Sequence, residues 1–488
     1  MTATREDLAP ATPASIDGGR PTRWSPVELL PPALMVALGV LLLLPGHGLW
    51  FDELFTAEVG RLPLGDILTA IVRGEGVTSY LEGVPPSYNA PYYVVVHAWM
   101  SVPGLGGDTS LRVLSLLAAA GGLALITRAV TRLGGAATGV LTGLLLAAGP
   151  LLVVHSVEAR SYGLTVLATG ATALGLVRWL QDPPRGLVLF GLAGAGMGLG
   201  HWYAVTVLAA FVVAAAVLRG RRALPVVLIG AAAALPACLL VGLNVLNGTG
   251  SRNAEHLDDT DGRLVGYAIE AWAGGRTPLL VLAVGLAVIG AVRGGGRRGR
   301  ELRVLGLAWT CVPLLLLVGA EFLRPVYHPR YLLAGLLGLG VLAAAGAMAA
   351  PRGARAPLAG LLLACALLSS VSLADRAPRE RADDLVRTLA ELQVAGEPVV
   401  AADQRAAIGL DHYVRTLAPR LRADVVLPPD DAPTDADRVW LVRRLIDGVP
   451  VPTDDDDILR AAGLRLVEER TFRGTQTRLV LQRWEDAG

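Results

Sequence analysis

The chain has 488 residues, of which 53% are hydrophobic and only 17% charged, with a mean hydropathy of +0.52. Soluble domains average about one quarter charged residues, so this composition excludes an ordinary soluble protein and indicates a polytopic membrane protein. The formal net charge of +1 provides no field that would attract nucleic acid, which we exclude as a partner. Cys238, Cys311 and Cys365 lie in apolar runs without metal-site or disulfide spacing, and we interpret them as core residues.

Long apolar stretches recur through the first three quarters of the chain. A membrane span requires about 20 mostly apolar residues. The sequence predicts about 11 transmembrane helices, at residues 29–45, 110–128, 136–154, 162–180, 186–202, 204–218, 223–243, 278–293, 304–320, 331–349 and 357–373. Residues 1–26, rich in Pro, Ala, Thr and Asp, are predicted to be a disordered N-terminus. Without a small-x-small cleavage site, the first apolar run is interpreted as an uncleaved anchor, and residues 27–375 as the transmembrane domain.

Arginine is the basic residue of this lysine-free chain, and it occupies alternate loops. These loops contain Arg128 and Arg132, Arg178 and Arg185, Arg219 to Arg222, Arg293 to Arg303, and Arg352 and Arg355. The positive-inside rule places them, and the N-terminus, in the cytoplasm. We therefore predict a multi-pass protein of the cell (plasma) membrane whose C-terminal residues lie outside. The other loops then face outward: residues 46–109, 155–162, 200–204, 244–277 and 321–330.

The long first outer loop begins with Trp50-Phe51-Asp52-Glu53, directly after the first span. Two carboxylates so close to a membrane are costly unless they face water, a cavity or a substrate. One of them is suited to accept a proton as a general base. The alternative is a pair of acids in the first turn of a surface helix. Later in the loop, Tyr92–Val102 is too short to span and is predicted to be an interfacial helix.

A second polar cluster, His155–Tyr162, lies at the outer end of the third predicted span. Glu158 and Tyr162 are four residues apart and share a helical face, whereas Arg160 does not. A glutamate and an arginine are natural partners of a sugar hydroxyl and a phosphate. The alternative is an ordinary interfacial ion pair.

Two more clusters lie at outer span ends. His201-Trp202-Tyr203 fits an aromatic belt, except that a belt does not explain His201. In the run Glu321–Tyr331, Arg330 precedes an apolar span on the side where positive charge is disfavoured, which predicts an acidic partner or a bound anion such as a lipid phosphate. The alternative is snorkelling of the arginine to lipid headgroups.

The composition changes from about Ala374, and residues 376–488 are predicted to form a small α/β domain outside the membrane. Helices are expected at 381–394, 404–416 and 454–462. Strands are expected at 398–401, 423–427 and 438–442, followed by a terminal hairpin formed by 465–472 and 478–484. The four acids Asp454–Asp457 are explained by capping of the last helix, and Arg297–Arg300 by topology.

The order of these pieces resembles the polytopic glycosyltransferases with the C fold, in the protein O-mannosyltransferase and aminoarabinose-transferase-like superfamily. The matching motifs are Trp50-Phe51-Asp52-Glu53, the segment Asn89–Trp99 (Asn-Ala-Pro-Tyr-Tyr-Val-Val-Val-His-Ala-Trp), Ser110–Ser115, Glu158-Ala159-Arg160-Ser161-Tyr162 and Pro329-Arg330-Tyr331-Leu332-Leu333. Together they cover about residues 25–375. The chain is similar above all to actinobacterial members described as mannosyltransferases.

This resemblance implies an inverting glycosyltransferase that moves mannose or arabinofuranose from a polyprenyl-phosphate donor to an acceptor hydroxyl outside the cytoplasm. The acceptor is a cell-envelope glycan, lipid or protein. Asp52 would be the catalytic base, Glu53 a supporting acid, and Arg330, Arg160 and His328 the donor-phosphate ligands. The sugar and acceptor pocket would be lined by Glu158, Tyr162, His201, Tyr203, Asn89, Tyr92 and Tyr327.

One departure from the family pattern concerns metal binding. Many relatives carry a second acid or a histidine shortly before the Tyr-Tyr pair, whereas Val84–Asn89 contains none and Glu82 is offset. We therefore assign no metal ligand and commit to no cofactor, and a divalent cation is left open.

Two other functions compete with the transferase. A transporter or flippase for a lipid-linked or anionic solute would place ionisable residues near the middle of its spans, whereas here they gather at the outer ends. A receptor-like protein built around the C-terminal domain would not explain the acids of the multi-span body.

Overall fold

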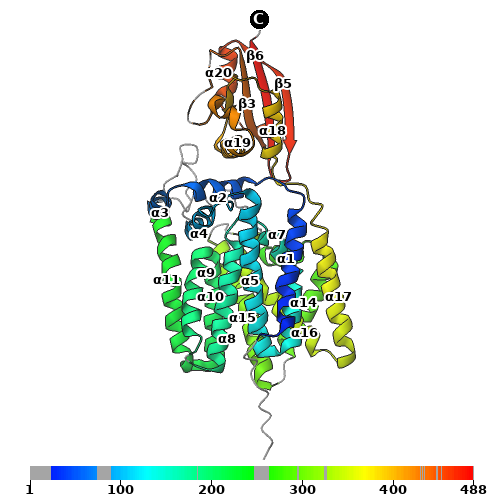
Figure 1. Cartoon of the computed structure of the whole chain (residues 1–488). Helices are drawn as coiled ribbons and strands as arrows, with labels where there is room; N and C mark the ends of the chain where they lie inside the picture. The colour runs from blue at the N-terminus through cyan, green and yellow to red at the C-terminus, as the bar shows by residue number, and fades with distance from the viewer. Residues whose placement is uncertain are drawn as a thin grey trace, which may run out of the picture.

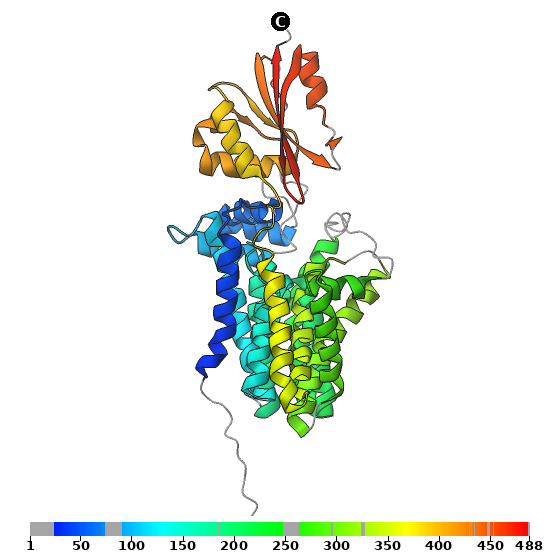
Figure 2. The same cartoon turned by 90° about the vertical axis from the view of Figure 1, so that its right-hand side faces the viewer.

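The computed structural model describes residues 24–73, 90–183, 185–246, 263–293, 296–323, 327–428, 430, 432–433, 435–446, 449–451 and 453–486. Most of the N-terminal segment predicted to be disordered, and the predicted pocket residue Asn89, lie outside these ranges. The described chain forms a bundle of apolar helices with a small sheet domain above one end (Figures 1 and 2).

The bundle consists of helices α1 and α5–α17, with short 3-10 turns between some of them. Their bounds are η1 Pro26–Leu29, α1 Leu30–Leu43, α5 Asp108–Gly134, α6 Ala136–Ala147, α7 Pro150–Ser156, α8 Tyr162–Gln181, α9 Leu187–Gly200, η4 Trp202–Ala204, α10 Val205–Arg219, η5 Gly220–Ala223, α11 Leu224–Leu246, α13 Leu264–Trp272, α14 Thr277–Val292, α15 Gly296–Glu321, η6 Pro329–Leu332, α16 Leu333–Ala349 and α17 Arg352–Val371. Each of the eleven predicted apolar stretches falls on one of these helices or, for residues 136–154, on the pair α6 and α7.

The predicted fold class, a polytopic helical membrane protein with a small C-terminal α/β domain, is confirmed. Among the described residues, seven helices are long and apolar enough to cross a membrane, or up to nine if each of two bent pairs forms one span. This count treats Trp202–Leu243 as one run of 42 residues and sets aside α9, which has 14 residues. The difference from eleven therefore lies in how short and bent helices are counted.

Close helix packing fixes the end of the bundle nearest the C-terminal domain (Figure 1), which is called its outer end below. A side chain at Gly163, near the start of α8, would collide with the backbone oxygen of Ser115 in α5, so only glycine allows this approach. The pair α6 and α7 bends by 63° at Gly149-Pro150, since proline cannot continue the hydrogen bonding of α6. Together these features hold the turn between α7 and α8, residues 157–161, at the outer surface.

Three short helices, α2 (Phe51–Arg61), α3 (Leu64–Arg73) and α4 (Ala90–Met100), form a layer across the outer ends of the bundle (Figure 1). Helix α4 coincides with the interfacial helix predicted from residue 92, and Pro91 occupies its first turn, where proline is tolerated. In α2, nine of the eleven residues are buried, including both Glu53 and Glu58. Such burial excludes an ordinary surface helix.

The C-terminal domain has a six-stranded sheet in the order β2-β1-β3-β6-β5, with β4 paired to β3. Strand β1 is parallel to β2 and β3, whereas the other pairs are antiparallel. The elements are α18 Ala382–Leu392, β1 Val399–Ala401, α19 Gln404–Leu417, η7 Pro419–Asp424, β2 Val425–Val426, β3 Arg438–Ile446, β4 Val449–Pro450, α20 Asp455–Ala461, β5 Leu464–Arg473 and β6 Arg478–Asp486. The predicted helices and strands of this region match these bounds closely, and β4 is an addition.

The outer layer and the C-terminal domain share one hydrophobic core. Buried side chains of α2 and α4, such as Leu54 and Tyr93, belong to the same cluster as Leu385 of α18 and Leu410 of α19. A second, larger cluster fills the helix bundle. Helix α2 therefore packs directly under the C-terminal domain.

Candidate active site

The central contact of the site joins Asp52 to Arg330, which are 278 residues apart in sequence. Asp52 lies in the first turn of α2, and Arg330 lies in the 3-10 turn η6, which follows His328 as its N-cap. Arg330 Nη1 donates to Asp52 Oδ2 at 3.0 Å, and both side chains are largely buried. Of the two partners predicted for Arg330, an acidic residue or a bound anion, the structure shows the first, and that residue is the one predicted as the catalytic base.

Two opposing influences set the charge of Asp52. Burial by itself would raise the pKa of this carboxyl, but the guanidinium groups of Arg160 and Arg330 hold it below its ordinary value. Asp52 is therefore ionised at neutral pH and able to accept a proton. Arg330 weakens its basicity for as long as the ion pair persists.

Arg160 approaches α2 from the turn between α7 and α8. Its Nη1 donates to the backbone oxygen of Asp52 at 3.0 Å and contacts the hydroxyl of Thr56 at 3.3 Å. Burial of the carbonyl and the guanidinium makes these hydrogen bonds strong determinants of position. Arg160 therefore both fixes the backbone of α2 and adds positive charge beside the Asp52 carboxylate.

Glu53 has a different role from its neighbour. Its carboxylate forms a two-point ion pair with Arg112 of α5, at 2.8 and 2.5 Å, and also accepts a hydrogen bond from the backbone N–H of Ala159 at 2.8 Å. Arg112 donates further to the backbone oxygens of His47 and Gly48. Glu53 thus ties α2 to α5 and to the 157–161 turn, and its supporting function stays a prediction.

Glu158 pairs with Arg379, a residue that was not predicted from the sequence. His155 Nδ1 lies 2.9 Å from Glu158 Oε2, and Arg379 of the C-terminal segment pairs with Glu158 Oε1. Burial would raise the pKa of Glu158, but Arg379 and His155 lower it, so this carboxyl is ionised. The guanidinium of Arg379 also lies over the ring of Trp50, 4.5 Å from its centroid. Arg379 follows the last apolar helix, in a stretch whose composition is ordinary for a soluble domain, so the sequence did not single it out.

Trp50 lies between two of these arginines. Arg330 approaches the indole ring to 5.7 Å, in addition to the Arg379 contact. The buried indole Nε1 has no hydrogen-bond partner among the described residues. An orphaned buried donor is costly, so this N–H is a ready contact for a ligand acceptor.

Aromatic rings form one wall beside Arg330. Tyr203 stacks on Tyr331, with ring centroids 4.6 Å apart and an interplanar angle of 9°. His201 lies within 5.7 Å of Tyr162, Tyr203 and Tyr331. This arrangement accounts for His201 better than an aromatic belt does, because its ring packs among site residues. Tyr331 was a motif residue without an assigned role.

The remaining predicted residues are placed less centrally. His328 accepts a long hydrogen bond from the Arg330 backbone and packs against Tyr331. Tyr92 is buried below the 157–161 turn, with its hydroxyl 3.4 Å from Ser115, whose own hydroxyl donates to Arg160 O. Tyr327 instead lies beside Glu321, to which its backbone N–H donates. The roles of all these residues stay predictions.

A cavity of about 130 Å³ adjoins the site on the far side of Trp50 and Glu158. It lies among the outer ends of α1, α7 and α17 and the segment leading to α18. Its polar lining includes His47, Arg112, Arg376 and Arg379. Asp52 and Arg330 do not line this cavity. Trp50 and Glu158 contact both the cavity and the residues around the Asp52–Arg330 pair, so the two are neighbouring but separate spaces.

Metal binding was left open by the sequence. Within the described ranges, no group of three or more His, Cys, Asp or Glu side chains is arranged to hold a metal ion. The charged side chains at the site pair with each other instead.

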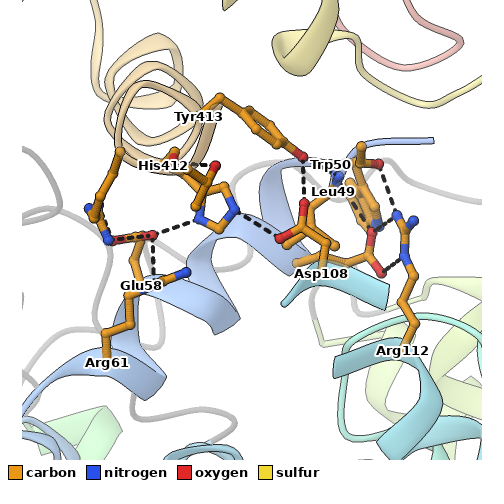
Figure 3. Close-up of polar contacts among 12 residues, drawn as sticks. Leu49, Trp50, Glu58, Arg61, Asp108, Arg112, His412 and Tyr413 are labelled. Atoms are coloured by element: carbon orange, nitrogen blue, oxygen red, sulfur yellow. Dashed lines mark hydrogen bonds and ion pairs between the residues drawn. The ribbon is translucent and has the colours of Figure 1, made fainter. Parts of the chain in front are cut away.

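Helix α2 also takes part in a second polar contact, here called the domain contact. Glu58 of α2 and Asp108 of α5 face His412 and Tyr413 of α19 (Figure 3), and Arg415 of α19 belongs to the same contact. His412 lies between two carboxylates, 2.8 Å from Glu58 and 3.0 Å from Asp108. Arg415 pairs with Glu58 at 2.8 Å, and Tyr413 donates to Asp108 at 3.2 Å. This contact ties the helix carrying Asp52 to the C-terminal domain.

No family model and no curated protein matches the sequence. Among solved structures, the chain is similar to ArnT from Cupriavidus metallidurans bound to undecaprenyl phosphate, with a TM-score of 0.56 and 13% identity over 92% of this chain and 97% of that one. For the apo state of ArnT the TM-score is 0.53 and the identity 15%, with the same coverage. The resemblance to the C fold drawn from the motifs is therefore confirmed for the fold.

Proposed function

We propose that this chain is a membrane glycosyltransferase that moves a sugar from a polyprenyl-phosphate donor to an acceptor hydroxyl at the outer face of the cell membrane. The observation that carries the proposal is the Asp52–Arg330 ion pair of 3.0 Å at the outer end of the bundle. The similarity of the fold to ArnT, whose structure was solved with undecaprenyl phosphate, supports a lipid-phosphate donor. Mannose and arabinofuranose are the sugars expected from the motifs.

The charge balance of the site suits a phosphate. Three guanidinium groups, those of Arg160, Arg330 and Arg379, surround two carboxylates, Asp52 and Glu158. The excess positive charge matches the single negative charge of a sugar phosphodiester. Arginine suits this role because its planar fork donates two parallel hydrogen bonds to phosphate oxygens. The orphaned Trp50 N–H offers a further donor.

The reaction follows from these positions. Arg330 and its neighbours hold the donor phosphate, and the Tyr203–Tyr331 stack offers an apolar face to the sugar ring. The acceptor oxygen attacks the anomeric carbon opposite the phosphate, and its proton passes to Asp52. The bond from the anomeric carbon to the phosphate oxygen breaks, and the electron pair stays on the phosphate. The arginines stabilise the negative charge gained there, and the configuration at the anomeric carbon inverts.

Binding of the donor would also activate the base. In the described structure Arg330 donates to Asp52 and lowers its basicity. A donor phosphate competes for the same guanidinium, so occupancy of the site raises the pKa of Asp52 towards that of an effective base. The base would then be strong only when a donor is present.

The placement of charge favours this reaction over transport. Within the described membrane helices the ionisable residues lie near helix ends, as Arg112, Arg128 and Arg178 do, whereas transporters place them near the bilayer centre. The transporter alternative therefore has no observation in its favour here.

The test is transfer of radiolabelled sugar from polyprenyl-phosphate donors to cell-envelope acceptors by the purified protein. Asp52→Asn should reduce turnover by about 10² to 10⁴-fold, the usual contribution of a general base. Asp66→Asn, at an exposed acid of α3 in the same loop, is the matched control and should retain full turnover. Unchanged turnover in Asp52→Asn, with an unchanged melting temperature, would remove the catalytic assignment.

A reporter fused after Gly488 tests whether the C-terminal domain lies outside the cytoplasm. Reporter activity in the cytoplasm would reverse the proposed orientation.

A further inference from the structure

The end of the bundle opposite the C-terminal domain contains a hollow of about 510 Å³. It is formed by the ends of α5, α14 and α16 and the beginnings of α6 and α15. This volume lies within the range of small-molecule pockets and exceeds what single water molecules occupy. It is separated from the candidate active site by the length of the membrane helices.

Arginines dominate the polar lining. The residues around the hollow include Arg128, Arg132, Arg293, Arg298 and Arg303, whereas Glu28 is the only carboxylate among the described lining residues. Gathering five guanidinium groups around one space costs electrostatic energy, which a multivalent anion offsets. The positive-inside rule explains arginines in these loops, but it does not require them to converge on one hollow.

The floor of the hollow is rigidly built. Arg128 is almost fully buried and donates to both carboxylate oxygens of Glu28, at 2.9 and 3.1 Å. Glu28 also accepts the backbone N–H of Ser25 at 2.9 Å, and the Trp24 ring lies 5.4 Å from the Arg128 guanidinium. Glu28 therefore neutralises Arg128 and anchors the start of the first span.

Neutral acceptors hold two of the other arginines in place. Arg132 Nε donates to Gln181 Oε1 at 2.9 Å, and Gln181 donates back to the Arg132 backbone oxygen. Arg303 donates to the backbone oxygen of Val292 at 3.1 Å. These hydrogen bonds orient the two guanidinium groups. Arg293 and Arg298 complete the rim and are exposed.

From this arrangement we propose that the hollow is an anion site for a phosphate-bearing ligand at the inner face of the membrane, distinct from the candidate active site. The required chemistry is a group of phosphate oxygens that carries negative charge and accepts several hydrogen bonds. A water-soluble polyphosphate and the headgroup of an anionic lipid both have it. Fixed arginine forks recognise such oxygens in pairs.

The test compares two double variants of the full-length protein. Arg293→Ala with Arg298→Ala removes two exposed rim arginines, whereas Arg221→Ala with Arg222→Ala removes two exposed arginines of the same face outside the hollow. Inorganic pyrophosphate is titrated at low salt and binding is followed by microscale thermophoresis. We expect the rim variant to bind at least about tenfold more weakly, because two charge-assisted contacts are lost, and the control to bind like the wild type.

A second arm identifies the source of the phosphate. Native mass spectrometry of protein released from nanodiscs of phosphatidylcholine with cardiolipin or phosphatidylglycerol counts the retained anionic lipids. Retention by the wild type and the control, loss in the rim variant and displacement by pyrophosphate would identify a lipid headgroup. Pyrophosphate binding that depends on the rim, without lipid retention, would identify a soluble ligand. Absence of both, or equal losses in the two double variants, would overturn the proposal.

Discussion

The candidate active site and the domain contact both depend on carboxylates of helix α2, yet they differ in how their charges are matched. In the domain contact, Glu58 and Asp108 enclose His412, and Arg415 completes the set. In the candidate site, three arginines face two carboxylates, and the buried Trp50 N–H has no partner among the described residues. The first cluster is closed, whereas the second has capacity for an anion and an acceptor.

This difference assigns separate tasks to one helix. A buried ion network whose members are all hydrogen-bonded holds elements in place, and removing one member is costly. A network with excess positive charge is suited to bind an anion. Changes at the site should therefore alter turnover without unfolding, and changes at the domain contact should alter stability and its pH dependence.

Arg330 should give the largest effect on turnover after Asp52. Arg330→Gln removes the guanidinium that would stabilise the leaving phosphate, and we expect kcat to fall by about 10² to 10³-fold. Arg330→Lys keeps the charge but not the two-point fork and should recover part of this loss. The control is Arg263→Gln, an exposed outer arginine that packs on Tyr267 away from the site. Equal kcat in Arg330→Gln and wild type, measured with saturating donor, would contradict the phosphate assignment.

Some parts of this fold could be predicted from local sequence patterns, and others could not. Apolar runs report directly on membrane helices, and alternation reports on strands, so the helix bundle and most of the C-terminal elements were predicted. The bends between α6 and α7 and between α13 and α14 depend on local breaks and on packing, which hydropathy does not measure. The shared core of α2 and α19 joins residues too distant in sequence to be inferred from periodicity.

The site was predictable where a residue violated a rule. Asp52 and Arg330 each stood out as a costly charge beside a span, and they pair with each other. Arg379 was missed because its surroundings are ordinary for a soluble domain, and only its three-dimensional proximity to Trp50 and Glu158 reveals it. Asp52 faces Arg330 and Glu53 faces Arg112. The sequence could not show which carboxylate faces which arginine, because this depends on how α2 is oriented in the fold.

Arg379 should have an intermediate effect. Arg379→Ala removes the partner of Glu158 and one cation beside Trp50, so donor binding should weaken and KM for the donor should rise about tenfold, with a smaller change in kcat. Arg387→Ala is the control, since this exposed arginine of α18 pairs only locally with Asp383 and Asp384 among its described ion pairs. If KM and kcat of Arg379→Ala match the control, Arg379 is a structural link between the domains and not part of the donor site.

His412 should affect stability more than chemistry. Burial would lower the pKa of this imidazole, but hydrogen bonds to Asp108 and Glu58 raise it above its ordinary 6.5. Its contribution to stability is then fully present below pH 6.5 and is lost as the pH rises through the raised value. Burial would raise the pKa of Glu58, but His412 and Arg415 lower it below 4.5, so its contribution is lost only at lower pH. The domain contact should be strongest between about pH 4.5 and 6.5.

The corresponding variant is His412→Gln. Removing one partner of a buried pair costs about 3 to 5 kcal/mol, so the melting temperature should fall by several degrees at pH 6 and by less at pH 9. Turnover per folded molecule should change by no more than a few-fold. The measurement is a set of thermal melts between pH 5 and 9 for the variant and the wild type. A constant difference across that range would show that His412 has the same pKa in the folded and unfolded protein, which would contradict the raised pKa.

Glu380 should give the smallest effect, and it tests the candidate site from the C-terminal side, because its carboxylate contacts the start of α2. Its carboxyl accepts the backbone N–H of Phe51 at 3.2 Å, next to Asp52, and burial raises its pKa from 4.5 to about 7. The folded protein then binds more protons than the unfolded chain between pH 4.5 and 7, so stability falls as the pH rises through this interval. Glu380→Gln keeps the acceptor and removes the titration. Relative to the wild type, the variant should gain about 2 to 4 °C in melting temperature between pH 5 and 8. Parallel melting curves for the two proteins would mean that Glu380 is ionised throughout, and that the segment leading from α17 to α18 meets Asp52 with a fixed negative charge.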